Sequence, residues 1–178
     1  MNRRAVFLDR DGVLNSAVVR DGRPYPPASE MDLQVLPGVD DACRVLRKAG
    51  FLLIMVTNQP DIARGTISEE AVTSMNDRLQ RELSLDAVYV CPHEGDACYC
   101  RKPKPGLLLE AASRFGIDLA ASYMIGDRWR DTEAGLNAGC CAVFIDYGYL
   151  EQRPRPPFHR VTSLGEAASW IIGQTRGA

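Results

Sequence analysis

The chain has 178 residues, of which 46% are hydrophobic and 25% charged, and its formal net charge is −2 at pH 7. A chain of this length suits one domain with a substantial core, so we expect residues 1–178 to form a single domain. The charge balance gives no basic excess for nucleic acid, and no stretch approaches the roughly 18 apolar residues of a membrane span. We therefore expect a cytoplasmic monomer without nucleic-acid or membrane partners.

Short apolar runs alternate with segments of helical periodicity along the chain. The apolar runs predict strands over 5–8, 52–56, 87–90, 123–125 and 142–145, and the periodic segments predict helices over 39–49, 69–83, 107–115, 132–138 and 164–172. Ser68 is a candidate helix N-cap, and Gly50, Gly116 and Gly139 are candidate C-terminal residues of helices. This alternation predicts an α/β fold, with a single doubly wound, Rossmann-like parallel sheet covered by helices on both faces.

Two carboxylates, Asp9 and Asp11, follow the first predicted strand and precede Gly12. Side chains two residues apart on an extended chain point the same way, and ligands of such sheets bind at the carboxyl ends of the strands. Paired like charges are costly unless a cation or a reaction uses them, although a solvated acidic turn is the alternative for these residues alone. The sequence thus predicts a site at the end of the first strand.

Polar side chains also follow the next three predicted strands. They are Thr57, Asn58 and Gln59 after the second strand, Lys102 after the third, and Asp127 and Asp131 after the fourth. Taken singly, each fits an ordinary turn or a solvated surface equally well. Taken together, the carboxylates, the hydroxyl and the lysine fit phosphoryl transfer through a carboxylate nucleophile, assisted by Mg²⁺.

In that chemistry Asp9 attacks phosphorus and forms an aspartyl-phosphate. Asp11 protonates the leaving oxygen and then deprotonates the water that hydrolyses the intermediate. Asp9, Asp127 and a backbone carbonyl of Asp11 hold the Mg²⁺, and Thr57 and Lys102 compensate the charge of the phosphoryl oxygens. Each of these roles is an expectation from residue type and order.

This pattern resembles the haloacid dehalogenase superfamily of phosphatases, whose motifs are DxD, then Thr or Ser, then Lys, then GDxxxD. The corresponding residues here are Asp9 and Asp11, Thr57, Lys102, and Asp127 and Asp131. The resemblance covers nearly the whole chain and implies a haloacid dehalogenase-like fold without a cap domain. It also implies that Asp131 belongs to the catalytic set and orients the lysine and the metal without reacting itself.

A cluster of thiols and one imidazole lies between the third predicted strand and Lys102. Cys91, His93, Cys98 and Cys100 form a C-x-H and a C-x-C pair, and four such ligands are the number that a closed tetrahedral Zn²⁺ site takes. Reactive or buried cysteines are the alternative reading. Because no coordination position would stay open, the zinc would be structural and would stiffen the loop that leads into the lysine.

The form CxH…CxCRKPxPG resembles the capless branch that contains the heptose bisphosphate and histidinol-phosphate phosphatases. Residues 57–65, TNQPDIARG, are similar to TNQSGIARG of the heptose enzymes, with Pro60 and Asp61 replacing Ser and Gly. The four-residue gap between His93 and Cys98 is closer to the loop of the histidinol enzymes. Arg128 stands where the heptose enzymes usually carry Lys.

The resemblance implies a Mg²⁺-dependent phosphatase that removes the C7 phosphate of D-glycero-D-manno-heptose 1,7-bisphosphate, a phosphorylated sugar used in nucleotide-heptose and surface glycan synthesis. Arg101 and Arg128 would then hold the distal phosphate or hydroxyls, and Arg64 either contributes or is solvated. The full implied substrate-binding set is Ala17, Val18, Val19, Arg20, Thr57, Asn58, Gln59, Pro60, Arg64, Arg101, Lys102 and Arg128.

Three alternatives stay open at this point. A histidinol-phosphate phosphatase of histidine biosynthesis fits the loop length, with Asp61 as a candidate partner for the substrate ammonium group. A phospho-accepting signalling domain also uses an Asp, a hydroxyl and a Lys on a doubly wound sheet, but Asp11 beside the nucleophile favours turnover. A zinc-knuckle binding module is disfavoured because the chain carries no basic excess.

Overall fold

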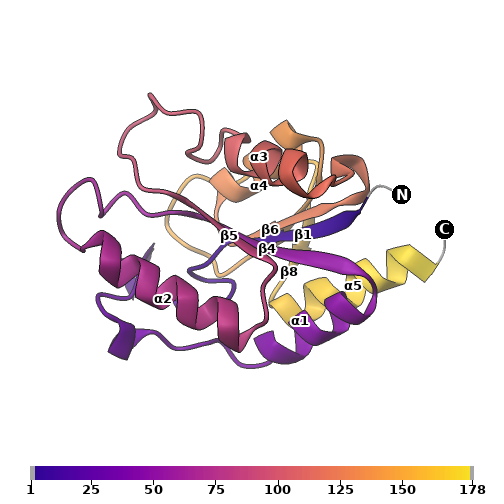
Figure 1. Ribbon diagram of the computed structural model, residues 1–178, viewed down its shortest axis with the longest axis horizontal. Helices are drawn as coiled ribbons and strands as arrows, with labels where there is room; N and C mark the ends of the chain where they lie inside the picture. The colour runs from indigo at the N-terminus through magenta and orange to yellow at the C-terminus, as the bar shows by residue number, and fades with distance from the viewer. Residues whose placement is uncertain (1–2, 177–178) are drawn as a thin grey trace.

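A six-stranded parallel sheet forms the centre of the computed structural model, which describes residues 3–176 (Figure 1). Its strands are β1 (Arg4–Leu8), β4 (Phe51–Asn58), β5 (Ala87–Cys91), β6 (Tyr123–Gly126), β7 (Cys141–Ile145) and β8 (His159–Val161). Their spatial order is β5-β4-β1-β6-β7-β8. The chain therefore reverses its direction of winding between β1 and β6, as in doubly wound folds. The predicted α/β class and parallel sheet are confirmed.

Helices cover both faces of this sheet (Figure 1). The helices α1 (Val39–Lys48), α2 (Glu69–Glu82) and α5 (Leu164–Arg176) pack on one face, and α3 (Gly106–Phe115) and α4 (Trp129–Ala138) pack on the other. Successive residues of β1 divide between the two cores: Val6 and Leu8 join the first, and Phe7 joins the second. Both faces being buried explains why the strands are almost continuously apolar.

The five predicted strands and five predicted helices are all present, with ends shifted by a few residues. Ser68 caps α2 as predicted, since its hydroxyl accepts a hydrogen bond from the Ala71 N–H at 3.1 Å. The sequence did not indicate β8 or the antiparallel hairpin of β2 (Val18–Arg20) and β3 (Arg23–Tyr25), because each strand has only three residues. No helix within residues 3–176 is long and apolar enough to cross a membrane.

The close approach of α4 to the sheet depends on Gly135. A Cβ atom at Gly135 would lie 2.6 Å from the Cβ of Met124 on β6, whereas a Cβ at Gly173 of α5 would meet no atom within 4 Å. The replacement Gly135→Ala is expected to lower the free energy of unfolding by about 1–2 kcal/mol, because overpacking outweighs the gain in helix propensity. Gly173→Ala is expected to raise it by about 0.5–1 kcal/mol.

Urea denaturation of both variants beside the parent protein measures these two changes. They are matched, since each adds one methyl group to a helix. A Gly135→Ala variant as stable as Gly173→Ala would show that the gap between α4 and β6 can widen without cost, against the packing described here.

Candidate active site

The carboxyl ends of β1, β4 and β6 surround one cavity of about 320 Å³. Ten sequence-predicted residues line it: Asp9, Asp11, Asn58, Pro60, Arg64, Arg101, Lys102, Asp127, Arg128 and Asp131. The hairpin residues 23–26, together with Asp61 and Arg130, complete the lining. The cavity lies at the switch point between β1 and β6, which is where doubly wound sheets bind ligands.

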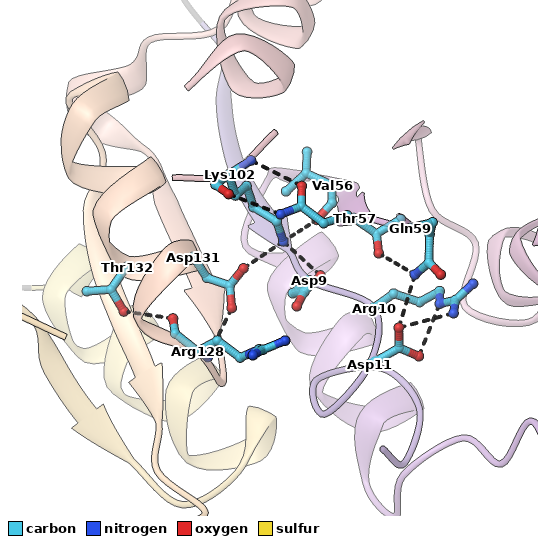
Figure 2. Close-up of polar contacts among 11 residues, drawn as sticks. Asp9, Arg10, Asp11, Val56, Thr57, Gln59, Lys102, Arg128, Asp131 and Thr132 are labelled. Atoms are coloured by element: carbon cyan, nitrogen blue, oxygen red, sulfur yellow. Dashed lines mark hydrogen bonds and ion pairs between the residues drawn. The ribbon is translucent and has the colours of Figure 1, made fainter. Parts of the chain in front are cut away.

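Lys102 lines this cavity and is 1% exposed, and its side chain points toward Asp9 and Asp131 (Figure 2). Its Nζ donates hydrogen bonds of 2.8 Å to Asp9 Oδ1 and to the Val56 carbonyl, and it lies 2.6 Å from Asp131 Oδ1. Burial disfavours the ammonium charge, but Asp131 and Asp9 prevail and raise the pKa of Lys102. The lysine is therefore a buried cation that holds two carboxylates together.

Three buried carboxylates, those of Asp9, Asp127 and Asp131, bring oxygen atoms within 4.8 Å of one another. Burial and the charge of Asp131 raise the pKa of Asp9 to about 6, against the effect of Lys102. Burial, Asp9 and Asp131 raise the pKa of Asp127 well above its usual range. Three carboxylates and one ammonium leave two negative charges uncompensated, which is the deficit that one divalent cation would fill.

The oxygen atoms of Asp127 are the best candidates for a metal ligand in this cluster. Both are buried and lack a partner of normal hydrogen-bond geometry among the described residues, although the nearby Tyr149 hydroxyl acts to lower the pKa of Asp127. Asp131 is more fully engaged, because its Oδ1 pairs with Lys102 and its Oδ2 accepts a 3.0 Å hydrogen bond from the Arg128 N–H. Mg²⁺ prefers oxygen ligands of this kind, so the oxygens of Asp127 together with those of Asp9 fit it, with Asp131 alongside.

Two glycines give the carboxylates their room. A Cβ atom at Gly12, where φ is +82°, would overlap the carboxylate of Asp127. A Cβ atom at Gly126 would overlap the side chain of Asp131. The dense packing of charge at the switch point thus requires both residues to lack a side chain.

Asp11 lies in the same cavity but is held apart from the carboxylate cluster (Figure 2). Its carboxylate accepts hydrogen bonds from Arg10 Nε at 3.2 Å, Arg10 Nη2 at 3.1 Å, Asn15 Nδ2 at 3.0 Å and Gln59 Nε2 at 3.0 Å. Since β1 ends at Leu8, the alternation of a strand does not orient it, contrary to the prediction. The loop contacts fix its position instead.

Arg10 was not singled out from the sequence, although it is fully buried. Besides its two bonds to Asp11, its Nη1 donates a 3.2 Å hydrogen bond to Asn76 Oδ1 of α2. An arginine between two aspartates has the composition of a solvated loop, so the sequence carried no signal for this contact. The structure makes Arg10 the link between Asp11 and the helix layer.

The residues at the carboxyl end of β4 and just after it act on their neighbours more than on the cavity. Thr57 and Gln59 are each 1% exposed and do not line it, and Gln59 Nε2 donates to both Asp11 and the Thr57 hydroxyl. The Asn58 amide exchanges two 3.1 Å hydrogen bonds with the backbone of Lys102. Asn58 therefore fixes the position of the lysine, and Gln59 fixes that of Asp11.

Ala17, Val18, Val19 and Arg20 do not line this cavity, contrary to the expectation for the first loop. The hairpin reverses the chain at residues 21–22, so the returning strand β3 contributes to the wall. Ala17 and Val19 instead line a neighbouring hollow beside Tyr147 and Tyr149. The sequence could not indicate this, because the hairpin itself was not predicted.

Arginines form the rim of the cavity. The five are Arg23, Arg64, Arg101, Arg128 and Arg130. Arg64 pairs with Glu94 at 2.7 Å and with Asp61 at 3.1 Å, and Arg128 Nε lies 3.0 Å from both carboxylate oxygens of Glu151. The remaining three give the rim its excess of positive charge above an acidic floor.

The cluster of Cys91, His93, Cys98 and Cys100 is also assembled, with one ligand atom from each residue within 4.8 Å of the others. The Sγ atom of Cys91 lies 3.6 Å from that of Cys98 and 3.2 Å from that of Cys100, and His93 Nδ1 lies 3.3 Å from Cys100 Sγ. A tetrahedron with metal–sulfur bonds of about 2.3 Å has edges of about 3.8 Å between sulfurs. The four side chains therefore fit a zinc ion with small adjustments.

This loop also supports the cavity wall. Arg101 Nη1 donates a 2.9 Å hydrogen bond to the His93 carbonyl, and Lys104 Nζ donates one of 2.8 Å to the Cys98 carbonyl. The conformation of the Cys/His loop thus affects the position of the Arg101 guanidinium at the rim.

Residues 24–139 match the family described as haloacid dehalogenase-like hydrolase. The chain belongs to the haloacid dehalogenase-like hydrolases. It is 41% identical to the D-glycero-beta-D-manno-heptose-1,7-bisphosphate 7-phosphatase of Yersinia pestis, with 94% of this chain and 89% of that protein covered. It is 40% identical to the protein of the same name from Vibrio cholerae, with 97% and 91% covered.

A crystal structure of the D,D-heptose 1,7-bisphosphate phosphatase from B. bronchiseptica, complexed with magnesium and phosphate, is similar to this fold. The TM-score is 0.83 at 31% sequence identity, and 96% of this chain and 99% of that chain are covered. The predicted superfamily and the expectation of a hydrolase are confirmed.

The ion pairs of Lys102 are expected to dominate the stability of the site. In a chelating buffer, Lys102→Met should lower the free energy of unfolding by about 3–5 kcal/mol, because two buried carboxylates lose the ammonium partner that they share. Adding Asp9→Asn to Lys102→Met should recover part of that loss. Chemical denaturation measures each value.

Arg44→Met is the matched control, since Arg44 pairs with Asp40 and Asp41 at the exposed surface of α1. It is expected to change the free energy of unfolding by less than about 1 kcal/mol. If Lys102→Met and Arg44→Met lowered the free energy of unfolding equally, the described burial of the Lys102 ion pairs would be contradicted.

Proposed function

We propose that this chain is a Mg²⁺-dependent phosphatase that hydrolyses the C7 phosphate of D-glycero-D-manno-heptose 1,7-bisphosphate through an aspartyl-phosphate. The observation that carries the chemistry is the buried set of Asp9, Asp127 and Asp131 around Lys102, open to a cavity with an arginine rim. The names of the relatives, about 40% identical over most of the chain, support the substrate.

Asp9 is the proposed nucleophile. One of its carboxylate oxygens forms a bond to phosphorus while the bond between phosphorus and the sugar oxygen breaks. Lys102, 2.8 Å from Asp9 Oδ1, keeps the nucleophile oriented and compensates the charge of the transferred phosphoryl group. Asp131 acts through Lys102, to which it is paired.

Asp11 is the proposed general acid and base. It gives a proton to the departing sugar oxygen, and it then takes a proton from the water that attacks phosphorus and regenerates Asp9. Phosphate and sugar are the products. The side chains of Arg10, Asn15 and Gln59 set the starting position of Asp11 for both steps.

The cation belongs with Asp9, Asp127 and Asp131, and the backbone carbonyl of Asp11 is a further proposed ligand. When bound, Mg²⁺ supplies positive charge that offsets the carboxylates and the phosphoryl oxygens. The magnesium and phosphate in the B. bronchiseptica structure support this choice of metal. The unpartnered oxygens of Asp127 give the independent support from this chain.

The arginine rim supports a substrate with a second anionic group. Guanidinium groups bind phosphate with two parallel hydrogen bonds, and several positive charges around a cavity attract a bisphosphate from solution. A heptose bisphosphatase would serve nucleotide-heptose synthesis for surface glycan. The expected cytoplasmic location, monomeric state, single capless domain and lack of nucleic-acid partners remain predictions.

A histidinol-phosphate phosphatase is not favoured. Asp61, the candidate partner for its ammonium group, is already paired with Arg64 at 3.1 Å. The positive rim would also repel an ammonium group. A phospho-accepting signalling domain is opposed by Asp11, which lies in the same cavity as Asp9 and would promote hydrolysis of the phosphorylated form.

We further propose that Cys91, His93, Cys98 and Cys100 hold a structural Zn²⁺. The ligand number and the distances between their atoms support this assignment. The hydrogen bond from Arg101 to the His93 carbonyl links the loop of these four residues to the arginine rim. A zinc ion in this loop would therefore help to position Arg101.

Phosphate release by the purified protein with Mg²⁺ tests the proposed activity. We expect kcat/KM for heptose 1,7-bisphosphate to exceed that for histidinol phosphate and for simple sugar monophosphates by at least about 10-fold. Asp9→Asn should lower kcat by about 1,000-fold or more, because an amide is a poor nucleophile. Asp41→Asn, which changes an exposed carboxylate of α1, is the matched control and should retain activity.

A preference for histidinol phosphate would reject the heptose substrate and retain the chemistry. Full activity of Asp9→Asn would reject the nucleophile. A phosphorylated protein that persists for hours with no release of phosphate would favour the signalling alternative.

Metal analysis tests the zinc assignment separately from activity. Native mass spectrometry should detect one Zn²⁺ per chain, lost in Cys91→Ser and retained in Cys43→Ser, whose thiol is buried in the core away from the cluster. Removal of zinc should also lower the melting temperature, because the ligands then no longer connect β5 to the loop before Lys102. A parent protein purified with zinc in the growth medium but containing none would contradict the assignment.

A further inference from the structure

Two arginines of the cavity rim were not indicated by the sequence: Arg23 of β3 and Arg130 of α4. Neither has an acidic partner among the described residues, unlike Arg64 and Arg128 of the same rim. Arginines that face a cavity without a carboxylate have five N–H donors available to a ligand. Their charges are thus the ones that a bound anion would neutralise.

Charged groups of both signs surround Arg130, and the positive ones have the larger effect. Burial and then repulsion from Arg101 lower the pKa of Arg130, and Arg128 adds to this effect while Asp96 and Glu151 oppose it. The guanidinium stays protonated at neutral pH, and a bound anion would reduce the repulsion that Asp96 and Glu151 do not offset. The guanidinium also stacks 4.5 Å above the ring of Trp129, which limits the conformations that it would lose on binding.

The hairpin and the start of α4 are connected to each other through the segment after β7. The Leu150 N–H donates a 2.8 Å hydrogen bond to the Gly22 carbonyl, and a Cβ atom at Gly22 would lie 2.7 Å from the Leu150 side chain. The next residue, Glu151, pairs with Arg128, the N-cap residue of α4. Arg23 and Arg130 are therefore carried by segments that these contacts connect to each other.

We propose that Arg23 and Arg130 bind the second phosphate of a bisphosphate substrate and thereby set the preference for bisphosphates over monophosphates. This inference rests on the proposed function of the same cavity. Arg128, which sequence resemblance assigns to the distal phosphate, acts chiefly as the structural partner of Glu151.

The test compares kcat/KM for heptose 1,7-bisphosphate with kcat/KM for heptose 7-phosphate, which lacks only the distal phosphate. Arg23→Met and Arg130→Met should each lower the value for the bisphosphate about 10-fold, mainly through KM, and the double variant about 100-fold. The value for the monophosphate should change less than about 3-fold. Arg130→Lys should retain part of the preference, because the charge remains while the paired N–H geometry is lost.

Arg81→Met is the matched control, because it removes one positive charge from the exposed end of α2, outside the cavity. It should leave both values unchanged. Comparable losses for the two substrates in the Arg23 and Arg130 variants would overturn the inference, since recognition of the distal phosphate predicts a selective loss.

The parent protein separates this inference from the function on which it rests. A parent that prefers the bisphosphate, with variants that keep the same preference, would overturn the role of Arg23 and Arg130 and leave the proposed function in place. A parent with no preference for the bisphosphate would overturn the proposed function and this inference with it.

Discussion

The structure of the site depends on one buried ammonium group. Lys102 is the common partner of Asp9 and Asp131, and it lies on a loop that enters from the far side of β4. Without this cation, the buried carboxylates of Asp9, which follows β1, and Asp131 of α4 would repel each other at this distance. The lysine still leaves a charge of −2 in the set that includes Asp127. The fold thus leaves two negative charges that the side chains of this set do not compensate and that a divalent cation would.

That arrangement constrains residues that never touch a substrate. Gly12 and Gly126 must lack side chains so that Asp127 and Asp131 fit beside β1. Asn58 bonds both to the carbonyl and to the N–H of Lys102, so the end of β4 fixes the backbone from which the ammonium group extends. The positions of the buried acidic side chains and of Lys102 therefore depend on hydrogen bonds that connect the carboxyl ends of neighbouring parallel strands.

The sequence was most informative where chemistry and local periodicity coincide. Apolar runs ending in Asp9, Thr57 and Asp127 predicted both the strands of the parallel sheet and the polar groups at their carboxyl ends. It was least informative for contacts between segments far apart in the chain. The burial of Arg10 against Asn76 depends on where α2 packs, and the place of Arg23 depends on a hairpin of two three-residue strands. Neither position carries a local pattern that differs from that of a solvated loop.

The same limit explains why the arginine rim could not be assigned from residue type alone. Arg128 and Arg130 are two residues apart, and both line the cavity. The difference between them arises from Glu151, 23 positions after Arg128, which forms a hydrogen-bonded ion pair with the guanidinium of Arg128 and none with that of Arg130. A charge that is already paired gains little from a further anion, whereas an unpaired charge under repulsion gains more. The affinity of such a rim for a phosphate group is therefore determined by the distribution of counter-ions around it, not by the number of arginines in it.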